Sequence, residues 1–177
     1  PVRIREGTKI KEKFVDIYFN IDHPDEDAEE IKEIARFEAG DLVDDYEILG
    51  LLGTGGMGYV YEARHRVLNK VYALKTIRAD RLNETIWRRL QVEAQAIARM
   101  NHPNIVGIHN FGMDDGRPFY VMDLLKGNSL AERLKKGPVT VEEAIAIFIE
   151  VCCGLNYAHK KGIIHRDIKP GNIIILA

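Results

Sequence analysis

Four glycines within six residues separate two stretches that favour β-strands, residues 46–52 before the cluster and residues 59–63 after it. The cluster reads Gly53-Thr54-Gly55-Gly56-Met57-Gly58. Because glycine has no Cβ, backbone N–H groups in such a loop can approach phosphate oxygens directly. A dinucleotide-binding fingerprint would open a helix here, and a Walker loop would continue as Gly-Lys-Ser/Thr. The order strand, glycine loop, strand excludes both, and the loop fits a plain hairpin as well as it fits a phosphate site.

The rest of the chain alternates between the period of strands and the period of helices. Strands are predicted at 70–77, 105–111, 118–122 and 173–176. Helices are predicted at 84–100, at 129–136 with Ser129 as N-cap, and at 140–161 with Thr140 as N-cap. The helix at 140–161 is apolar on nearly every side, which is typical of a helix at the centre of a larger domain.

Residues 1–45 differ from the rest in charge. They hold 14 acidic and 7 basic residues, whereas residues 46–177 hold 13 acidic and 18 basic ones. Alternating apolar and polar residues predict a strand at 14–22, and Pro24 followed by acidic residues predicts a helix that Gly40 ends. One strand and one helix are too small to fold alone. We therefore expect this acidic N-terminal extension to pack on the rest or to belong to an upstream domain.

Composition argues against several classes of protein. The apolar runs are far shorter than the roughly 18 residues that a transmembrane helix needs, so no membrane segment is expected. The basic residues are scattered without interleaved aromatic ones, which gives nucleic-acid binding no support. The two cysteines, Cys152 and Cys153, are neighbours in the apolar helix, where a mutual bridge would be strained. We expect two buried thiols in a reducing compartment, and hence a cytoplasmic protein.

Lys75 and Glu93 are candidates for a phosphate-binding pair. Val71, Ala73 and Lys75 share one face of the predicted strand because alternate residues of a strand point the same way. A lysine aligned with the glycine loop could bind phosphates, and Glu93 on the next helix could orient its ammonium group. A strand-end lysine and a helix-surface acid are the plain interpretations of the same two residues.

The run His165-Arg166-Asp167-Ile168-Lys169-Pro170-Gly171-Asn172 sets three functional polar residues on one tight turn. Asp167, Lys169 and Asn172 on such a loop can act together on a transferring phosphoryl group. His165 is expected to anchor the loop rather than to act as an acid or base. The other histidines show no metal-ligand spacing with the cysteines.

Residues 46–177 closely resemble the eukaryotic-like protein kinases. The resemblance rests on the order of eight residues: Gly53, Gly55, Gly58, Lys75, Glu93, Asp167, Lys169 and Asn172. Lys-Pro-Gly-Asn at 169–172 resembles the serine/threonine branch, and together with the glycine loop it is most similar to bacterial (Hanks-type) members. The resemblance implies an α+β fold. A kinase N-lobe of five antiparallel strands and one long helix, with the hinge, would occupy 46–125, and an incomplete helical C-lobe would occupy 126–177.

The resemblance also implies roles for individual residues. Those implied to bind ATP are Leu52, Gly53, Thr54, Gly55, Gly56, Met57, Gly58, Tyr59, Val60, Ala73, Lys75, Met122, Asp123 and Leu125. Lys75 would hold the α- and β-phosphates and pair with Glu93. Val60 and Ala73 would enclose the adenine, with Met122 as gatekeeper and residues 123–125 as the hinge. Asp167 would accept or orient the substrate hydroxyl, Lys169 would neutralise the transferring phosphate, and Asn172 would bind Mg²⁺.

By this resemblance the parent protein transfers the γ-phosphate of ATP, with Mg²⁺, to serine or threonine of a protein substrate. The family's Asp-Phe-Gly motif and the rest of its C-lobe are expected beyond Ala177, where they would cover the helix at 140–161 and pair with the strand at 173–176. The 177 residues alone are therefore expected to lack activity. The alternative is a non-catalytic, nucleotide-binding or regulatory fragment of the pseudokinase kind, against which the intact Lys75, Glu93 and Asp167 argue.

Overall fold

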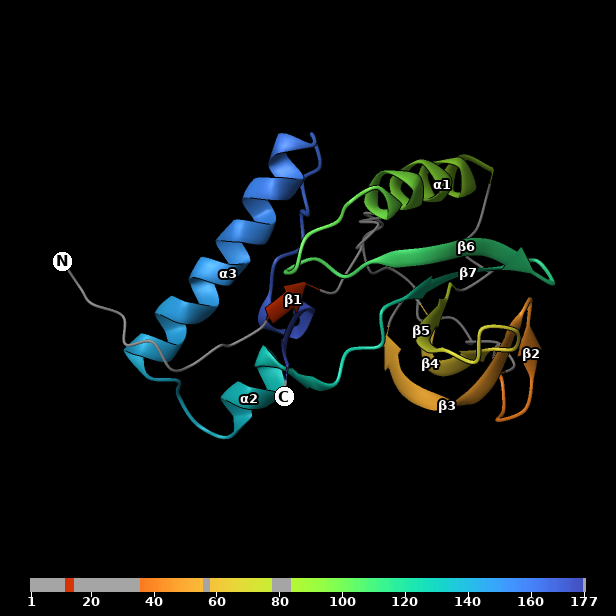
Figure 1. The fold of residues 1–177 in the computed structure, drawn as a ribbon, viewed down its shortest axis with the longest axis horizontal. Helices are drawn as coiled ribbons and strands as arrows, with labels where there is room; N and C mark the ends of the chain where they lie inside the picture. The colour runs from red at the N-terminus through yellow and green to blue at the C-terminus, as the bar shows by residue number, and fades with distance from the viewer. Residues whose placement is uncertain (1–11, 15–35, 56–57, 78–83, 177) are drawn as a thin grey trace, which may run out of the picture. The chain divides into compact units, whose positions relative to one another are not determined.

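The structure is a computed structural model, and it describes residues 12–14, 36–55, 58–77 and 84–176. The chain forms two compact units, each considered by itself below. The sheet unit comprises the described residues of Ile21–Arg99 and Gly107–Leu124. The helix unit comprises the described residues of Pro1–Asn20, Met100–Val106 and Leu125–Ala177. Figure 1 shows both as ribbons and labels most of their helices and strands.

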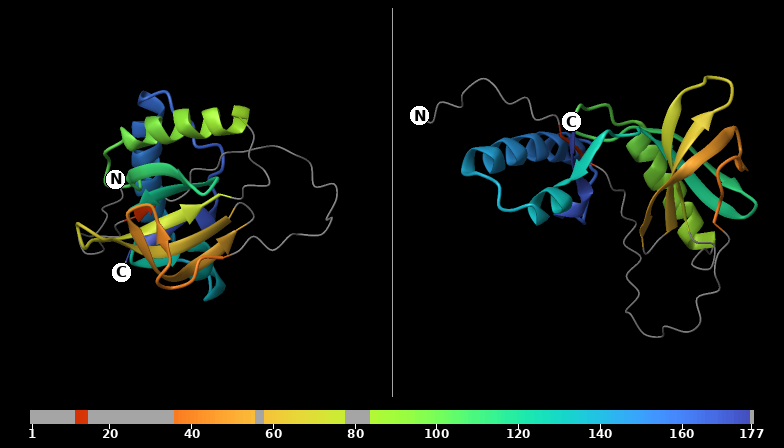
Figure 2. Two further views of the ribbon diagram at one scale, coloured as in Figure 1. Left: turned by 90° about the vertical axis from the view of Figure 1, so that its right-hand side faces the viewer. Right: turned by 90° about the horizontal axis from the view of Figure 1, so that it is seen from below.

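The sheet unit is built on a six-stranded antiparallel sheet in the order β2-β3-β4-β5-β7-β6. Its strands are β2 (Leu42–Val43), β3 (Tyr46–Gly55), β4 (Gly58–His65), β5 (Val71–Thr76), β6 (Ile108–Asp114) and β7 (Arg117–Met122). Helix α1 (Glu84–Ala98) lies against β6 (Figures 1 and 2). Five strands and the helix confirm the predicted N-lobe. The sixth strand, β2, has two residues and is too short to show a period in the sequence.

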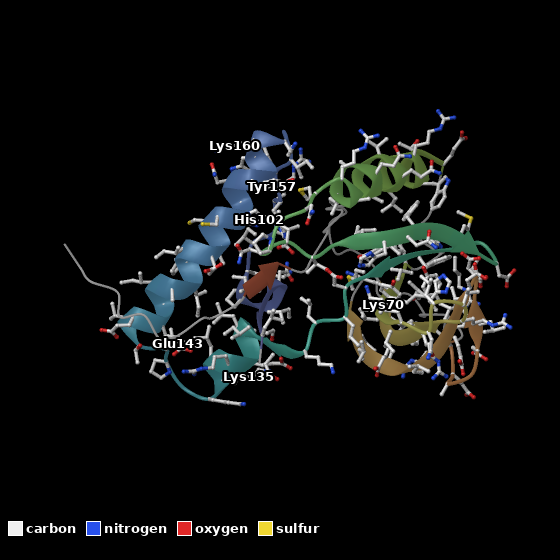
Figure 3. The ribbon with its side chains drawn as sticks, in the orientation of Figure 1. Lys70, His102, Lys135, Glu143, Tyr157 and Lys160 are labelled. Carbon is white, nitrogen blue, oxygen red and sulfur yellow. The ribbon has the colours of Figure 1, made fainter. Side chains whose placement is uncertain are left out.

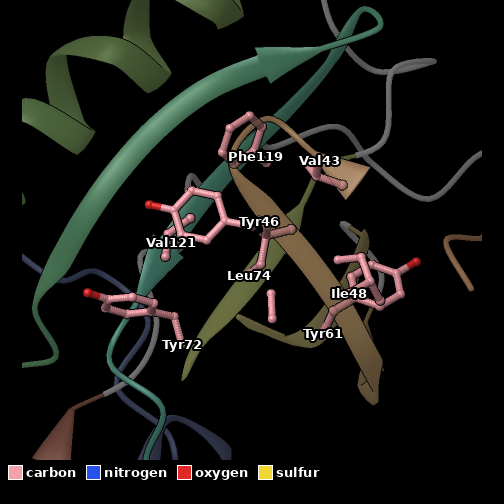
Figure 4. Packing of buried hydrophobic residues seen from close by; sticks show 9 residues of the cluster. Val43, Tyr46, Ile48, Tyr61, Tyr72, Leu74, Phe119 and Val121 are labelled. Carbon is pink, nitrogen blue, oxygen red and sulfur yellow. The ribbon is translucent and has the colours of Figure 1, made fainter. Parts of the chain in front are cut away.

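The core of the sheet unit lies on one face of the sheet. It consists of Val43, Tyr46, Ile48, Tyr61, Ala63, Tyr72, Leu74, Phe119 and Val121 (Figure 4). On β5 the core residues Tyr72 and Leu74 alternate with Ala73 and Lys75, and alternate residues of a strand face opposite sides of a sheet. Burial of the aromatic and aliphatic face therefore directs Lys75 to the other face.

The last part of the predicted N-terminal helix is wrong. Residues 36–40 are not helical, and the helix predicted before them lies outside the described residues, as do residues 15–22 of the predicted strand. Phe37 packs against the core, and its N–H donates a hydrogen bond to the Tyr61 hydroxyl at 3.2 Å. The N–H of Gly40 donates to the carbonyl of Ile48 at 2.8 Å. These contacts hold the segment beside β3 in a non-helical path that ends in a turn at residues 39–40.

The helix unit contains α2 (Leu130–Lys135), α3 (Val141–Lys160), the short 3₁₀ helix η2 (Pro170–Asn172) and a three-stranded sheet. Ser129 caps α2 and Thr140 caps α3, and both helices confirm the predictions. The strands are β1 (Glu12–Phe14), β8 (Gly127–Ser129) and β9 (Ile173–Leu176), in the order β1-β9-β8. Ile147 and Val151 of α3 form a core with Ile173 of β9.

The strand at 173–176 was expected to pair with residues beyond Ala177, but it pairs within the chain. Ile174 of β9 lies opposite Ser129 of β8 on one side and opposite Lys13 of β1 on the other. An unpaired strand edge exposes unsatisfied N–H and C=O groups, and pairing satisfies them. Pairing between residues so distant along the chain has no signal in the local sequence pattern.

The segment Met100–Val106 is tied to α3 by three contacts. The N–H of Asn101 donates to the Tyr157 hydroxyl at 3.3 Å, and the rings of His102 and Tyr157 lie 5.1 Å apart (Figure 3). The buried side chain of Asn104 donates to Glu150 Oε2 at 2.5 Å. Strand β6 begins after this segment, at Ile108 rather than at the predicted residue 105.

Helix α3 buries one line of residues, Ile147, Val151, Gly154 and Ala158. Its apolar residues Val141 and Phe148 are about two-thirds exposed, at 70% and 67%. Cys152 and Cys153 are exposed too, so the prediction of two buried thiols is wrong. The cysteines lie off the buried line, which recurs every three or four residues as one helix face does. Across the described residues, no helix combines the length and apolar character needed to cross a membrane.

Candidate functional site

Strand pairing brings the glycine loop and Lys75 into one row across the sheet. Gly53 lies opposite Val60, Val60 opposite Lys75, and Lys75 opposite Tyr120. Side chains of cross-strand partners point to the same face of a sheet, so Val60, Lys75 and Tyr120 share the face that is opposite the core. The Lys75 ammonium lies 5.8 Å from the centre of the Tyr120 ring. The lysine predicted to bind phosphates and the glycine-rich hairpin thus meet in one row.

Small apolar groups adjoin Lys75 on the same face. Ala73, two residues before Lys75, lies opposite Met122, and both are buried, with 5% and 7% of their surface exposed. The structure thereby brings Val60, Ala73 and Met122, all implied to surround the adenine, onto one face. Leu52 lies in β3 and is half exposed. Thr54 lies opposite Tyr59 at the end of the same hairpin.

Two glycines of the hairpin are needed for different reasons. Gly58 has a φ of +152°, and a Cβ on it would overlap the carbonyl oxygen of Thr76, so the fold itself requires glycine there. A Cβ on Gly53 would have no atom within 4 Å. Packing within the described residues therefore does not explain Gly53, and an open backbone for a ligand would. Gly56, Met57 and the surroundings of Gly55 lie outside the description.

Helix α1 packs on the face of the sheet that carries Lys75. Trp87 of α1 stacks on Phe111 of β6, with ring centres 5.0 Å apart and planes inclined by 22°. Phe111 lies opposite Tyr120, so it shares the face of Tyr120 and Lys75. Glu93 lies on this helix, but its side chain is outside the described part of the chain. Its pairing with Lys75 stays a prediction.

The loop at 165–172 brings Asp167, Lys169 and Asn172 together in the helix unit. Asp167 Oδ2 lies 2.9 Å from the Lys169 ammonium and accepts a hydrogen bond from Asn172 Nδ2 at 3.0 Å. Asn172 Nδ2 also donates to the backbone carbonyl of Asp167 at 2.8 Å. Asn172 is 3% exposed and ends η2, which the Pro-Gly turn begins. All three residues named from the sequence therefore converge on one carboxylate.

The loop is anchored by local geometry. The N–H of Asp167 donates to Nδ1 of His165 at 3.3 Å, in line with the anchoring role expected for His165. Arg166 has a φ of +64°, a left-handed conformation that costs free energy in a non-glycine residue and is common at functional sites. The hydrogen bond from Lys169 lowers the pKa of Asp167; partial burial opposes this and the bond from Asn172 adds to it. Asp167 is therefore an ionised acceptor at neutral pH.

The model of the protein kinase domain family matches residues 46–177. The chain belongs to the protein kinase family. Serine/threonine-protein kinase PknH of Mycobacterium tuberculosis is 40% identical over 138 residues, which are 77% of this kinase chain and 22% of PknH. A Clostridium perfringens protein named as a probable serine/threonine-protein kinase is 44% identical over 132 residues, 73% of this chain and 19% of that protein. This kinase chain thus spans about a fifth of the length of these relatives.

Solved structures of kinase domains are similar as well. The crystal structure of the Mycobacterium tuberculosis PknI kinase domain matches with a TM-score of 0.74 and 29% identity, over 80% of this kinase chain and 59% of that domain. The family and the fold agree with the resemblance seen in the sequence, including its serine/threonine branch and bacterial type.

The kinase loop offers oxygen ligands of the kind that Mg²⁺ prefers, the carboxylate of Asp167 and the amide oxygen of Asn172. Asn172 directs its Nδ2 at Asp167, which leaves its Oδ1 for another partner. In the described part of the chain, no three His, Cys, Asp or Glu side chains gather as a metal site. These residues fit a partial Mg²⁺ site, which substrate phosphates and water can complete.

Two residues that contact Asp123, the first residue of the predicted hinge, had no signal in the sequence. The Asp123 carboxylate bonds to the N–H of Gly107 and to Nε2 of His109, both in or next to β6. Leu125, the last predicted hinge residue, follows in a half-buried loop. A lone glycine and a lone histidine carry no motif, so only the sheet register brings them to Asp123.

Proposed function

We propose that this kinase transfers the γ-phosphate of ATP to a serine or threonine hydroxyl of a protein. The observation that carries the proposal is the convergence of Lys169 and Asn172 on Asp167 within one short loop. An acceptor, a cation and an amide in this arrangement suit phosphoryl transfer, which depends on positioning and charge stabilisation more than on covalent steps.

In the sheet unit, the row from Gly53 to Lys75 supports a role in nucleotide binding. Backbone groups of Gly53–Gly58 and their neighbours Leu52 and Tyr59 cover the phosphates, and Lys75 holds them through its ammonium. Val60, Ala73 and Met122 form an apolar surface for the adenine. The hinge at 123–125 supplies backbone hydrogen bonds to the base. Glu93 orients Lys75.

In the helix unit, Asp167 accepts the hydrogen of the substrate hydroxyl. Its lowered pKa makes it a weak base, so it orients the hydroxyl and takes the proton late, when the new phosphorus–oxygen bond has made that proton acidic. Lys169 neutralises charge on the transferring group. Asn172 would hold Mg²⁺, which, when bound, offsets negative charge on the phosphates.

Three further assignments from the sequence are kept as parts of this proposal. Residues 46–125 form the N-lobe with its hinge, and residues 126–177 form part of the C-lobe. Residues 1–45 form an acidic extension, although the described residues 36–43 of it pack with the sheet unit. A cytoplasmic location fits a protein that uses ATP and keeps two exposed free thiols.

The test is thermal unfolding of the 177-residue chain with ATP and Mg²⁺. A ligand that binds the folded state raises Tm as its concentration rises, by RT ln(1 + [L]/Kd) in free energy. We expect ATP to raise Tm and a nucleotide-free triphosphate to raise it less. A Tm unaffected by millimolar ATP would overturn the nucleotide assignment. A rise with ATP, but no phosphate transfer by a longer chain that includes the remaining kinase domain, would favour the pseudokinase alternative.

A further inference from the structure

The carboxylate of Asp123 is held by two groups at the start of β6. Its Oδ2 accepts a hydrogen bond from the N–H of Gly107 at 3.0 Å, and its Oδ1 lies 2.8 Å from Nε2 of His109. The N–H of Asp123 donates to the carbonyl of Gly107 at 3.0 Å. An ionised carboxylate only accepts hydrogen bonds, so Nε2 of His109 carries the hydrogen. We call these three contacts the Asp123 clamp.

A bulge in β6 explains how His109 reaches Asp123. Ile108 lies opposite Met122 and Asn110 lies opposite Val121, so His109 is an extra residue in the strand. A bulge bends its strand and redirects the side chain. The imidazole also packs against the Tyr72 ring, with ring centres 5.0 Å apart.

Gly107 lets the carboxylate come close. A Cβ on this residue would lie 3.2 Å from Asp123 Oδ2, closer than ordinary van der Waals contact. Gly107, His109 and Asp123 all belong to the sheet unit. The clamp thus lies within one unit.

The clamp lies where the proposed hinge begins. Strand β7 ends at Met122, and Asp123 is the first residue past its last ladder pair. The position of the Asp123 backbone therefore depends on the clamp, whereas that of Met122 depends on the sheet. A hinge that presents its backbone groups to a base must be held still, because a displaced donor or acceptor loses its hydrogen bond.

We propose that His109 is a positioning residue for nucleotide binding, which acts through Asp123 to hold the hinge backbone in place. The inference rests on the proposed role of the hinge in binding adenine. His109 acts on the base and not on the phosphates, which Lys75 and the glycine loop bind. Loss of the His109 bond therefore weakens the binding of ATP and of adenosine by the same factor. It leaves the binding of inorganic triphosphate unchanged.

Two substitutions separate the hydrogen bond from the packing. His109→Phe keeps a ring against Tyr72 and removes the donor, whereas His109→Gln keeps an N–H donor and removes the ring. His159→Phe, at an exposed position in the last turn of α3, is the matched control. We expect His109→Phe to weaken ATP binding roughly three- to tenfold, the effect of losing about one hydrogen bond. His109→Gln and the control should stay within about twofold of the unaltered chain.

Calorimetric titration with ATP, adenosine and triphosphate measures these affinities, and hydrogen exchange of the amides at 123–125 measures the clamp itself. Faster exchange in His109→Phe is expected. Equal ATP affinity in His109→Phe and the unaltered chain would overturn the proposal, and so would an equal loss for triphosphate. If the unaltered chain does not bind ATP, the proposed function fails. In that case, unchanged exchange in His109→Phe still refutes the clamp, and faster exchange supports it.

Discussion

The Lys169 ammonium and the Asp167 carboxylate, which belong to the same short loop, lie 2.9 Å apart. Asp167 is thus paired before any substrate arrives. Asn172 adds two hydrogen bonds to Asp167, one to the backbone carbonyl and one to Oδ2, the oxygen that Lys169 also contacts. The loop is preorganised, so little reorganisation is needed when a hydroxyl and a phosphate approach.

Substitution of Lys169 should raise the pKa of Asp167. In Lys169→Met the largest cause of the lowered pKa is removed, so the pKa of the Asp167 carboxyl rises toward its ordinary value. A lowered folded-state pKa stabilises the fold above the unfolded-state value, and this contribution is lost as pH falls through the folded-state value. Carboxyl chemical shifts followed by NMR between pH 2 and 6, as a rough range, measure the change. An unchanged Asp167 titration would contradict the pairing, and Lys126→Met serves as control.

Gly58 and Gly53 should respond differently to alanine. Gly58→Ala forces a Cβ onto the Thr76 carbonyl at a φ of +152°, so we expect a loss of stability on the order of 1–3 kcal/mol. The Cβ added in Gly53→Ala has no atom within 4 Å, so this substitution should leave stability almost unchanged. It should weaken ATP binding. Urea unfolding and ATP titration of both variants measure the two effects. Equal stability of the two variants would show that the approach of Gly58 to Thr76 is not formed.

Replacement of Lys75 should weaken nucleotide binding without unfolding the chain. The Lys75→Met side chain keeps its length but loses the charge, and a hydrogen bond to a charged group contributes about 1.5–3 kcal/mol. We therefore expect roughly 10- to 100-fold weaker ATP binding and a smaller thermal shift. Lys70→Met, which removes an ammonium 4.9 Å from the Tyr72 ring, is the control. A Lys75→Met chain that binds ATP as the control does would exclude the assigned phosphate contact.

The N-cap of α3 should contribute to stability in the usual way. Thr140 Oγ1 accepts a hydrogen bond from the N–H of Glu143 at 3.1 Å. Thr140→Ala leaves that N–H without its cap and should cost about 1 kcal/mol, whereas Thr140→Ser keeps the oxygen and should cost much less. The free energy of unfolding in urea distinguishes them. An alanine variant as stable as the serine variant would mean that the cap is not formed.

Phosphate transfer should be absent from the 177 residues by themselves. They span 59% of the PknI kinase domain, and no three His, Cys, Asp or Glu side chains gather as a metal site in the described part of the chain. Labelled ATP, Mg²⁺ and a generic basic protein should give no more product with the chain than with its Asp167→Ala variant. Turnover that depends on Asp167 would refute this prediction.

Much of this kinase could be predicted from local pattern. The strands β3, β4, β5 and β7, the helices α1, α2 and α3, and the caps Ser129 and Thr140 are all formed as expected. Hydrophobic period and capping depend on residues a few positions apart, so a single sequence carries them. Asp167, Lys169 and Asn172 could be found in the same way, because they are close in the chain. Their roles, like those of the nucleotide-binding residues, stay predictions until tested.

Other features depend on partners distant along the chain. The bulge that sends His109 to Asp123 is visible only in the pairing of β6 with β7. The pairing of β1 with β9 and the non-helical path of residues 36–40 likewise depend on contacts with remote segments. Cys152 and Cys153 are exposed because α3 buries a single line of residues, and the sequence does not say which line meets a core.

By itself, the sequence determined the family, the order of the elements and the residue types of the loop at 165–172. Each of these depends on residues that are close together in the chain. Only the tertiary structure decided the row from Gly53 to Lys75, the clamp on Asp123 and the exposed face of α3. Each of these depends on strand register or on packing between segments, and one added residue, as at His109, changes which side chains meet.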